Sequence, residues 1–101
     1  MIYLAQCSAF SPAFFDAAAQ WIPREKRAPI AAIRHEQTRR QSLLGWSMLT
    51  LMRAKAGKPT DAPLRFAEGK KPFFDDAGFH FNLSHSGDFV CLAVDDAPIG
   101  V

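Results

Sequence analysis

The hydrophobic period of the 101-residue chain changes once, and this change limits the fold more than any other feature. In the first part, large or apolar side chains recur every three or four residues, which is typical of a helix with one buried face. From Leu64 onward apolar residues alternate with polar ones, as at 79–83, which is typical of strands with one buried face. The change predicts an α+β fold, in which a small, mostly antiparallel sheet packs against one long and one short helix. The helical positions are Ile33, Gln37, Gln41, Leu44, Met48 and Leu51.

Capping residues predict where the helices begin and end. Ser11-Pro12 marks a helix start, because a serine cap accepts a free N–H and proline is tolerated in the first turn. We expect a short helix from there through Ala18 to Trp21. A longer helix is expected to begin near Pro29 and to end at Gly57-Lys58-Pro59, since glycine and proline terminate helices.

The last part of the chain reads as strands. Residues 89–94 are apolar at every position, which favours a strand covered on both faces. Residues 95–98, with two aspartates and a proline, predict the turn of a hairpin whose second strand begins at residues 99–101. Because natural domains seldom stop two or three residues into an apolar strand, we expect the chain to be a piece of a longer protein.

Composition narrows the class of protein. Hydrophobic residues make up 49% and charged residues 22%, as in ordinary globular domains, and the length leaves room for one domain. No stretch approaches the ~18 apolar residues of a membrane span, and the N-terminus lacks the basic start of a signal peptide. We therefore expect a cytoplasmic protein without membrane association. Cys7 and Cys91 lie among apolar neighbours, which predicts buried free thiols.

The net charge of +2 hides an uneven distribution. Between Pro23 and Lys58 there are nine basic residues and two acidic ones, a net charge of +7. The rest of the chain has three basic and eight acidic residues, a net charge of -5. The localised positive charge permits an anionic, phosphate-bearing ligand, and the alternative interpretation is a solvated helix face.

The densest polar cluster is 82–87, where the alternating strand is expected to end in a turn. Ser84, His85 and Ser86 would offer hydroxyls, an imidazole and backbone N–H groups to one anion. The alternative is a polar turn that only closes a hairpin. Lys71, in the Gly-Lys-Lys-Pro segment 69–72, would bring an ammonium to the same end of the sheet, although such a loop is usually only a solvated turn.

Other chemistries fit the sequence less well. Ser84 and His85 are adjacent on an extended chain, so their side chains point to opposite faces and cannot pair as nucleophile and base. His80, His85 and Cys91 lack the spacing of a zinc site. The basic segment has no recognised nucleic-acid-binding motif around it and the overall charge is low, so we expect no nucleic-acid partner and keep this role as a minor alternative.

Several segments occur in an order that resembles the Sfp-type 4'-phosphopantetheinyl transferases. They are EKR, RRQSLLG, GKKP, FHFNLSHSG and FVCLAVDDAPIGV. The family's strongest signature is an N-[LI]-S-H-S-G segment followed by an apolar strand and P-I-G-[VI]-D-x-E, and this sequence matches it from Asn82 to its last residue. The resemblance covers nearly the whole chain.

The resemblance implies an enzyme that moves phosphopantetheine from coenzyme A to a serine of an acyl or peptidyl carrier protein, releasing adenosine 3',5'-bisphosphate. The fold would consist of two similar halves, and residues 1–101 would be the N-terminal subdomain, ending before the second. By motif, the residues near the nucleotide and its phosphates would be Lys26, Ser42, Lys71, Ser84 and His85.

Two departures limit what the resemblance implies for this chain. Pro29 stands where many relatives place a second basic residue, which leaves Arg27 or Arg40 as candidate replacements. The Mg²⁺ ligands of the family begin directly after the Gly-Val dipeptide at 100–101, so this chain would hold neither metal ligands nor catalytic residues, and by itself would be inactive. Alternatives are a stand-alone basic module for an anionic partner and a half-domain that associates with itself.

Overall fold

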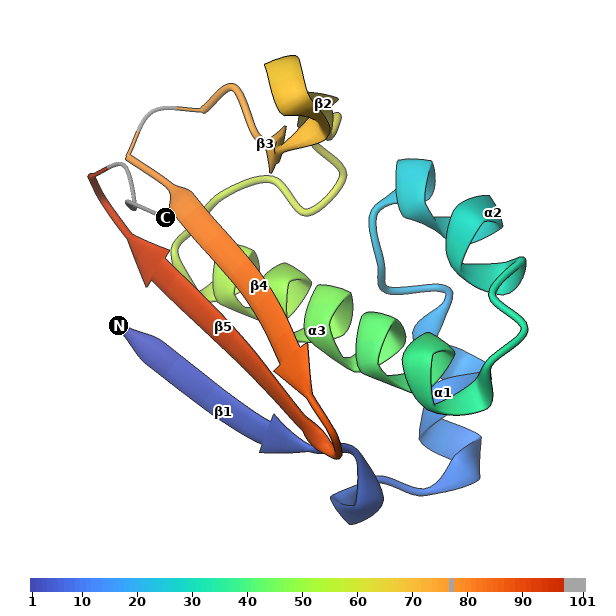
Figure 1. The fold of residues 1–101 in the computed structure, drawn as a ribbon. Helices are drawn as coiled ribbons and strands as arrows, with labels where there is room; N and C mark the ends of the chain where they lie inside the picture. Colours follow the sequence, from blue (N-terminus) through green and yellow to red (C-terminus); the bar gives the residue numbers. More distant parts are fainter. Residues whose placement is uncertain (77, 98–101) are drawn as a thin grey trace.

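The computed structural model describes residues 1–76 and 78–97, and they form an α+β fold, as predicted (Figure 1). A three-stranded antiparallel sheet has the strand order β1-β5-β4. Its strands are β1 (Ile2–Gln6), β4 (His80–Ser86) and β5 (Phe89–Asp95). The long helix α3 (Glu36–Lys55) packs against one face of this sheet, and two short helices pack against α3 rather than against the sheet.

The first short helix, α1 (Pro12–Ala18), begins as predicted. The Ser11 side chain accepts a hydrogen bond from the Phe14 N–H at 3.3 Å, and Pro12 occupies the first turn. The helix ends earlier than expected, so that Trp21 lies in the turn that follows it.

The prediction of one long helix from near Pro29 is wrong. Pro29 lies inside a second short helix, α2 (Arg24–Ala31), and α3 starts afresh after His35, whose Nδ1 accepts a hydrogen bond from the Thr38 N–H at 3.3 Å. The apolar period hid this break because Ile33, in the connection, still packs against the core. The predicted helix end is confirmed, since α3 stops at Lys55 and Gly57 has a φ of 73°.

Strand β4 is longer than predicted. It continues through Ser84 and His85, which pair with Cys91 and Val90 of β5. The prediction of a turn over 82–87 is therefore wrong, because pairing with β5 keeps the chain extended until Gly87. A separate ribbon pairs β2 (Arg65–Phe66) with β3 (Pro72–Phe73), and short 3-10 helices lie at Cys7–Ala9 and Glu68–Lys70.

The central strand β5 is covered on one face only, so the prediction of two covered faces is wrong. Val90 and Leu92 are buried, whereas Phe89 is exposed. On β1 the same uncovered face carries Ile2 and Leu4, which are 75% and 66% exposed. Cys7 is a buried free thiol, as predicted, and Cys91 is only half-buried. The expected strand at 99–101 lies outside the described residues.

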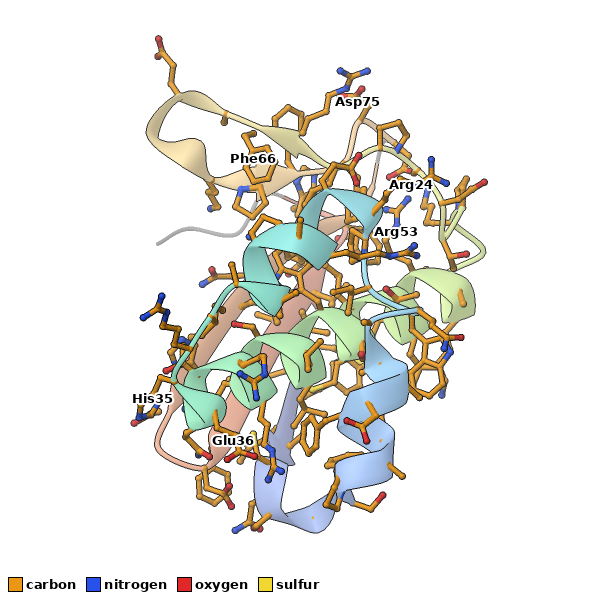
Figure 2. All side chains as sticks on the ribbon, turned by 90° about the vertical axis from the view of Figure 1, so that its right-hand side faces the viewer. Arg24, His35, Glu36, Arg53, Phe66 and Asp75 are labelled. Carbon is orange, nitrogen blue, oxygen red and sulfur yellow. The ribbon has the colours of Figure 1, made fainter. Side chains whose placement is uncertain are left out.

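Arg53 is buried inside the fold, with only 1% of its surface exposed, near the end of α3 (Figure 2). Its guanidinium donates to both carboxylate oxygens of Asp76, at 2.8 and 2.6 Å, and to the Pro59 carbonyl. The Cζ atom of Arg53 lies 3.8 Å from the centroid of the Phe74 ring and 4.9 Å from the centroid of the Phe79 ring. The ion pair ties the end of α3 to the segment that leads into β4. None of the helices in residues 1–76 and 78–97 combines the length and the apolar composition of a membrane span.

Truncation of Leu44 tests the contact between α3 and the rest of the core. This side chain is 1% exposed, so Leu44→Ala removes buried methyl groups and leaves a cavity. We expect the free energy of unfolding to fall by about 2–5 kcal/mol, measured by urea titration. A loss below about 1 kcal/mol would show that the site collapses freely or is not packed as described.

The Arg53–Asp76 pair predicts a loss of stability in acid. The hydrogen bonds from Arg53 hold the pKa of the Asp76 carboxyl below its ordinary value of 3.8. The folded state therefore favours the carboxylate, and its contribution is complete above about pH 4 and lost as the pH falls through the lower folded-state pKa. We expect Asp76→Asn to have a lower free energy of unfolding than the wild-type chain at neutral pH. Below about pH 4, its free energy of unfolding should fall less steeply than that of the wild-type chain.

The matched control is Asp75→Asn. Asp75 pairs with Arg65 at the surface, where both side chains are more than half exposed. Exposed pairs contribute about 0–1 kcal/mol, so this variant should lose less stability than Asp76→Asn in the same titration. Equal losses in the two variants would contradict a special role for the buried pair.

Candidate functional site

A cavity of about 250 Å³ lies beside α3 and the edge strand β4. Four of the five residues predicted to bind the nucleotide line it, namely Ser42, Lys71, Ser84 and His85. They come from three separate parts of the chain: α3, the residue before β3, and β4. The fold therefore gathers two hydroxyl groups, an ammonium group and an imidazole around one space.

Gly45 allows α3 to approach the sheet closely beside this cavity. A Cβ atom at this position would lie 3.2 Å from Leu83 Cδ2 and 3.2 Å from Val90 Cγ1. Ser42 lies one turn earlier on the helix, and Val90 is the strand partner of His85. The Ser-Leu-Leu-Gly sequence thus has a physical role, because the missing side chain lets Ser42 and His85 border the same cavity.

The two neighbours on β4 contribute from different sides of the strand. His85 is on the face that also carries Phe81 and Leu83 and turns toward α3, whereas Ser84 is on the uncovered face. Both border the cavity because β4 is an edge strand. The side chains cannot reach each other, so Ser84 cannot use His85 as its base.

Lys26, the fifth predicted residue, lies beside the cavity rather than in its wall. Its Nζ is 5.3 Å from the centroid of the Trp46 ring, and Trp46 lines the cavity. The exposed Phe66 ring is 5.9 Å away on another side. In the described part of the chain Lys26 has no ion-pair partner, and its ammonium group makes cation–π contacts with these two rings.

Three arginines of the basic segment serve the fold itself. Arg27 donates to the Ile22 and Gln20 carbonyls, and Arg39 donates to the Ile33 carbonyl at 2.9 Å. Arg40 pairs with Glu36 at 2.9 Å and lies over the Phe15 ring. Neither Arg27 nor Arg40, the candidate replacements for a basic residue at Pro29, lines the cavity.

The sequence did not single out the hydrogen bonds that hold the turn next to His85. The Gly87 carbonyl accepts hydrogen bonds from the side-chain amides of Gln37, at 2.8 Å, and Gln41. On the other side of the turn, the Ser8 N–H donates to the Asp88 carboxylate at 3.1 Å, and hydrogen bonds from Ser8 hold the pKa of Asp88 below its ordinary value. In the sequence, Gln37 and Gln41 were noted only as positions that recur with the period of a helix.

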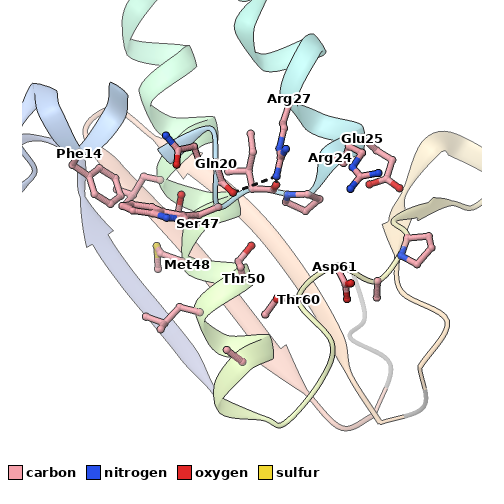
Figure 3. A pocket seen from close by; sticks show the side chains of 18 of the residues that line it. Phe14, Gln20, Arg24, Glu25, Arg27, Ser47, Met48, Thr50, Thr60 and Asp61 are labelled. Atoms are coloured by element: carbon pink, nitrogen blue, oxygen red, sulfur yellow. Dashed lines mark hydrogen bonds between the residues drawn. The ribbon is translucent and has the colours of Figure 1, made fainter. Parts of the chain in front are cut away.

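A larger cavity of about 940 Å³ is lined by other residues of α3 and by the α1–α2 connection (Figure 3). Its walls include Phe14, Trp21 and Met48, and it contains none of the predicted site residues. The hydroxyl of Ser47, also in its lining, is buried and has no hydrogen-bond partner among the described residues. In residues 1–76 and 78–97 no three His, Cys, Asp or Glu side chains gather as metal ligands would.

Comparison with known proteins agrees with the resemblance. Residues 9–97 match the family described as 4'-phosphopantetheinyl transferase, N-terminal, and the chain belongs to this family. It is 40% identical over 80 residues to the 4'-phosphopantetheinyl transferase psf-1 of Bacillus pumilus, covering 76% of this chain and 34% of that protein. It is 32% identical over 84 residues to the 4'-phosphopantetheinyl transferase Sfp of Bacillus subtilis (strain 168), covering 80% and 38%. The matched part is thus less than half the length of these relatives.

Substitution of Gly45 tests the close approach of helix and sheet. Gly45→Val places a branched side chain against Leu83 and Val90, and we expect a loss of about 1–3 kcal/mol in the free energy of unfolding. Gly45→Ala should cost less, because a gain in helix propensity of about 1 kcal/mol opposes the tight contact. Ala54→Val, at an exposed position of the same helix, is the control and should cost less than about 1 kcal/mol. Equal effects at positions 45 and 54 would contradict the close approach.

Proposed function

We propose that this chain is the coenzyme A-binding N-terminal part of a 4'-phosphopantetheinyl transferase, which moves phosphopantetheine from coenzyme A to a serine of an acyl or peptidyl carrier protein. The observation that carries the proposal is the cavity that Ser42, Lys71, Ser84 and His85 share. Membership of the family supports the reaction class. A cytoplasmic location is part of the same proposal.

The chemistry of the cavity suits phosphate. Hydroxyl and imidazole groups donate hydrogen bonds to phosphate oxygens, and Lys71 supplies a point charge. Lys26 adds a second ammonium group just outside, where an anion could draw it from the Trp46 and Phe66 rings. These interactions would hold the nucleotide end of coenzyme A.

The size of the cavity limits what it would hold. Pockets that bury a drug-sized ligand measure about 300–1,000 Å³, and this one measures about 250 Å³. It would therefore enclose only part of coenzyme A, and the phosphate-bearing part fits the polar lining best. The phosphopantetheine arm would extend beyond these residues.

The role proposed for this chain is to bind and orient coenzyme A. A magnesium ion bound by carboxylates would stabilise the charge that develops on the transferred phosphoryl group. The resemblance places its first ligands after Val101, and the described residues contain no cluster that would replace them. In this proposal the residues of this chain bind and orient coenzyme A, and the carrier-protein partner belongs to the whole enzyme.

The alternative, a stand-alone basic module for an anionic partner, has less support. It needs a free positive surface, whereas Arg27, Arg39, Arg40 and Arg53 use their guanidinium groups within the fold. A general basic surface would also bind in a strongly salt-dependent way that does not depend on His85.

Removal of the imidazole tests the proposal. His85→Ala should weaken coenzyme A binding by about 10- to 100-fold, as expected when one hydrogen bond to a charged group is lost. The measurement is isothermal titration calorimetry on the chain. His80→Ala, on the same strand but outside the cavity, is the control and should bind with unchanged affinity. Wild-type affinity in His85→Ala, or no binding by the wild-type chain, would overturn the proposal.

A further inference from the structure

One backbone carbonyl next to the candidate site accepts hydrogen bonds from two side-chain amides. Gln37 and Gln41 lie one turn apart on α3, and both donate from Nε2 to the Gly87 carbonyl. Gln41 is only 6% exposed and itself lines the cavity. A buried amide is costly unless it is hydrogen-bonded, so this arrangement fixes both glutamines to the turn.

The two residues that directly follow β1 hold the same turn from its other side. The Cys7 N–H donates to the Asp88 carbonyl at 2.7 Å, and the Ser8 N–H donates to the Asp88 carboxylate at 3.1 Å. Gly87 has a φ of 57°, a conformation that residues with side chains rarely adopt. The turn therefore has one defined geometry, set jointly by α3 and by the residues that follow β1.

This geometry bears on His85, which precedes Gly87 by two residues. With the turn fixed, the last residues of β4 cannot twist away from β5, and the imidazole stays on the side of α3. The Gly87 carbonyl also points toward α3, as its two amide donors require. Left unpaired there, its oxygen would repel an anion in the neighbouring cavity.

We propose that Gln37 and Gln41 are positioning residues for His85. They hold the hairpin turn so that the imidazole faces the cavity, and they pair with a carbonyl oxygen that would otherwise oppose an anionic ligand. The ligand part of this inference rests on the proposed function. The mechanical part, the holding of the turn, does not.

A double-mutant cycle with His85 tests the ligand part. In the full chain, Gln37→Met with Gln41→Met keeps the side-chain length and removes both donors. We expect coenzyme A affinity, measured by calorimetry, to fall about tenfold. In the His85→Ala background the same two glutamine substitutions should change the coenzyme A affinity less than about twofold, because no imidazole remains to be positioned. Equal losses in both backgrounds, or no loss, would overturn the positioning role.

The controls separate positioning from general damage. Gln20→Met makes the same chemical change outside this cavity and should leave the affinity unchanged. Circular dichroism shows whether the double variant is folded. If it is not, Gln37→Met alone removes one of the two donors at a less buried position. Its loss should be about threefold and should also disappear in the His85→Ala background.

Amide hydrogen exchange tests the mechanical part without any ligand. The Cys7 and Ser8 amides both donate to Asp88, so they report on the turn. In the glutamine double variant we expect these two amides to exchange at least about tenfold faster, while the Leu92 amide in the central strand is unchanged. If the wild-type chain does not bind coenzyme A, the proposed function fails and this measurement still decides whether the glutamines hold the turn. Unchanged exchange at Cys7 and Ser8 would overturn the inference.

Discussion

The ion pair of Arg53 with Asp76 is the constraint on which much of the structure depends. A buried guanidinium must have its donors satisfied, and here two carboxylate oxygens, the Pro59 carbonyl and two aromatic faces surround it. These partners come from the loop after α3 and from the segment before β4. Because Lys71 and β4 are attached to that segment, the pair also places one wall of the candidate site.

Nearer the middle of α3, Gly45 controls the distance between the helix and the sheet. The absent side chain lets the helix backbone approach Leu83 and Val90, and the cavity forms where this close contact meets the free edge of β4. The Gln37 and Gln41 amides then attach the first turns of the same helix to the hairpin. One helix therefore fixes the sheet at several points along its length, which explains how small polar groups from distant parts of the chain share one space.

Charge is used in two ways in the basic segment. Arg27, Arg39 and Arg53 satisfy carbonyl or carboxylate groups of the fold, so most of their charge is not offered to a ligand. The two lysines of the candidate site behave differently. Lys26 makes cation–π contacts with Trp46 and Phe66, and Lys71, which lies outside the basic segment, is exposed at the cavity. The different roles of arginine and lysine are consistent with the geometry of their side chains. The planar guanidinium of arginine can satisfy several fixed acceptors at once, whereas the ammonium group of lysine can adapt to an acceptor that moves.

The sequence by itself determined the class of fold, the capped start of α1, the end of α3 and the motifs that identify the family. Each of these features depends on the local hydrophobic period or on residues that are neighbours in the chain. Tertiary structure decided the rest. The helix break before Glu36 was invisible because Ile33 keeps the apolar period across it. The extension of β4 through His85 needed its pairing with β5, and the burial of Arg53 needed a carboxylate 23 positions away. Such features depend on partners that are distant in the chain, and no local pattern specifies which partner a residue will meet.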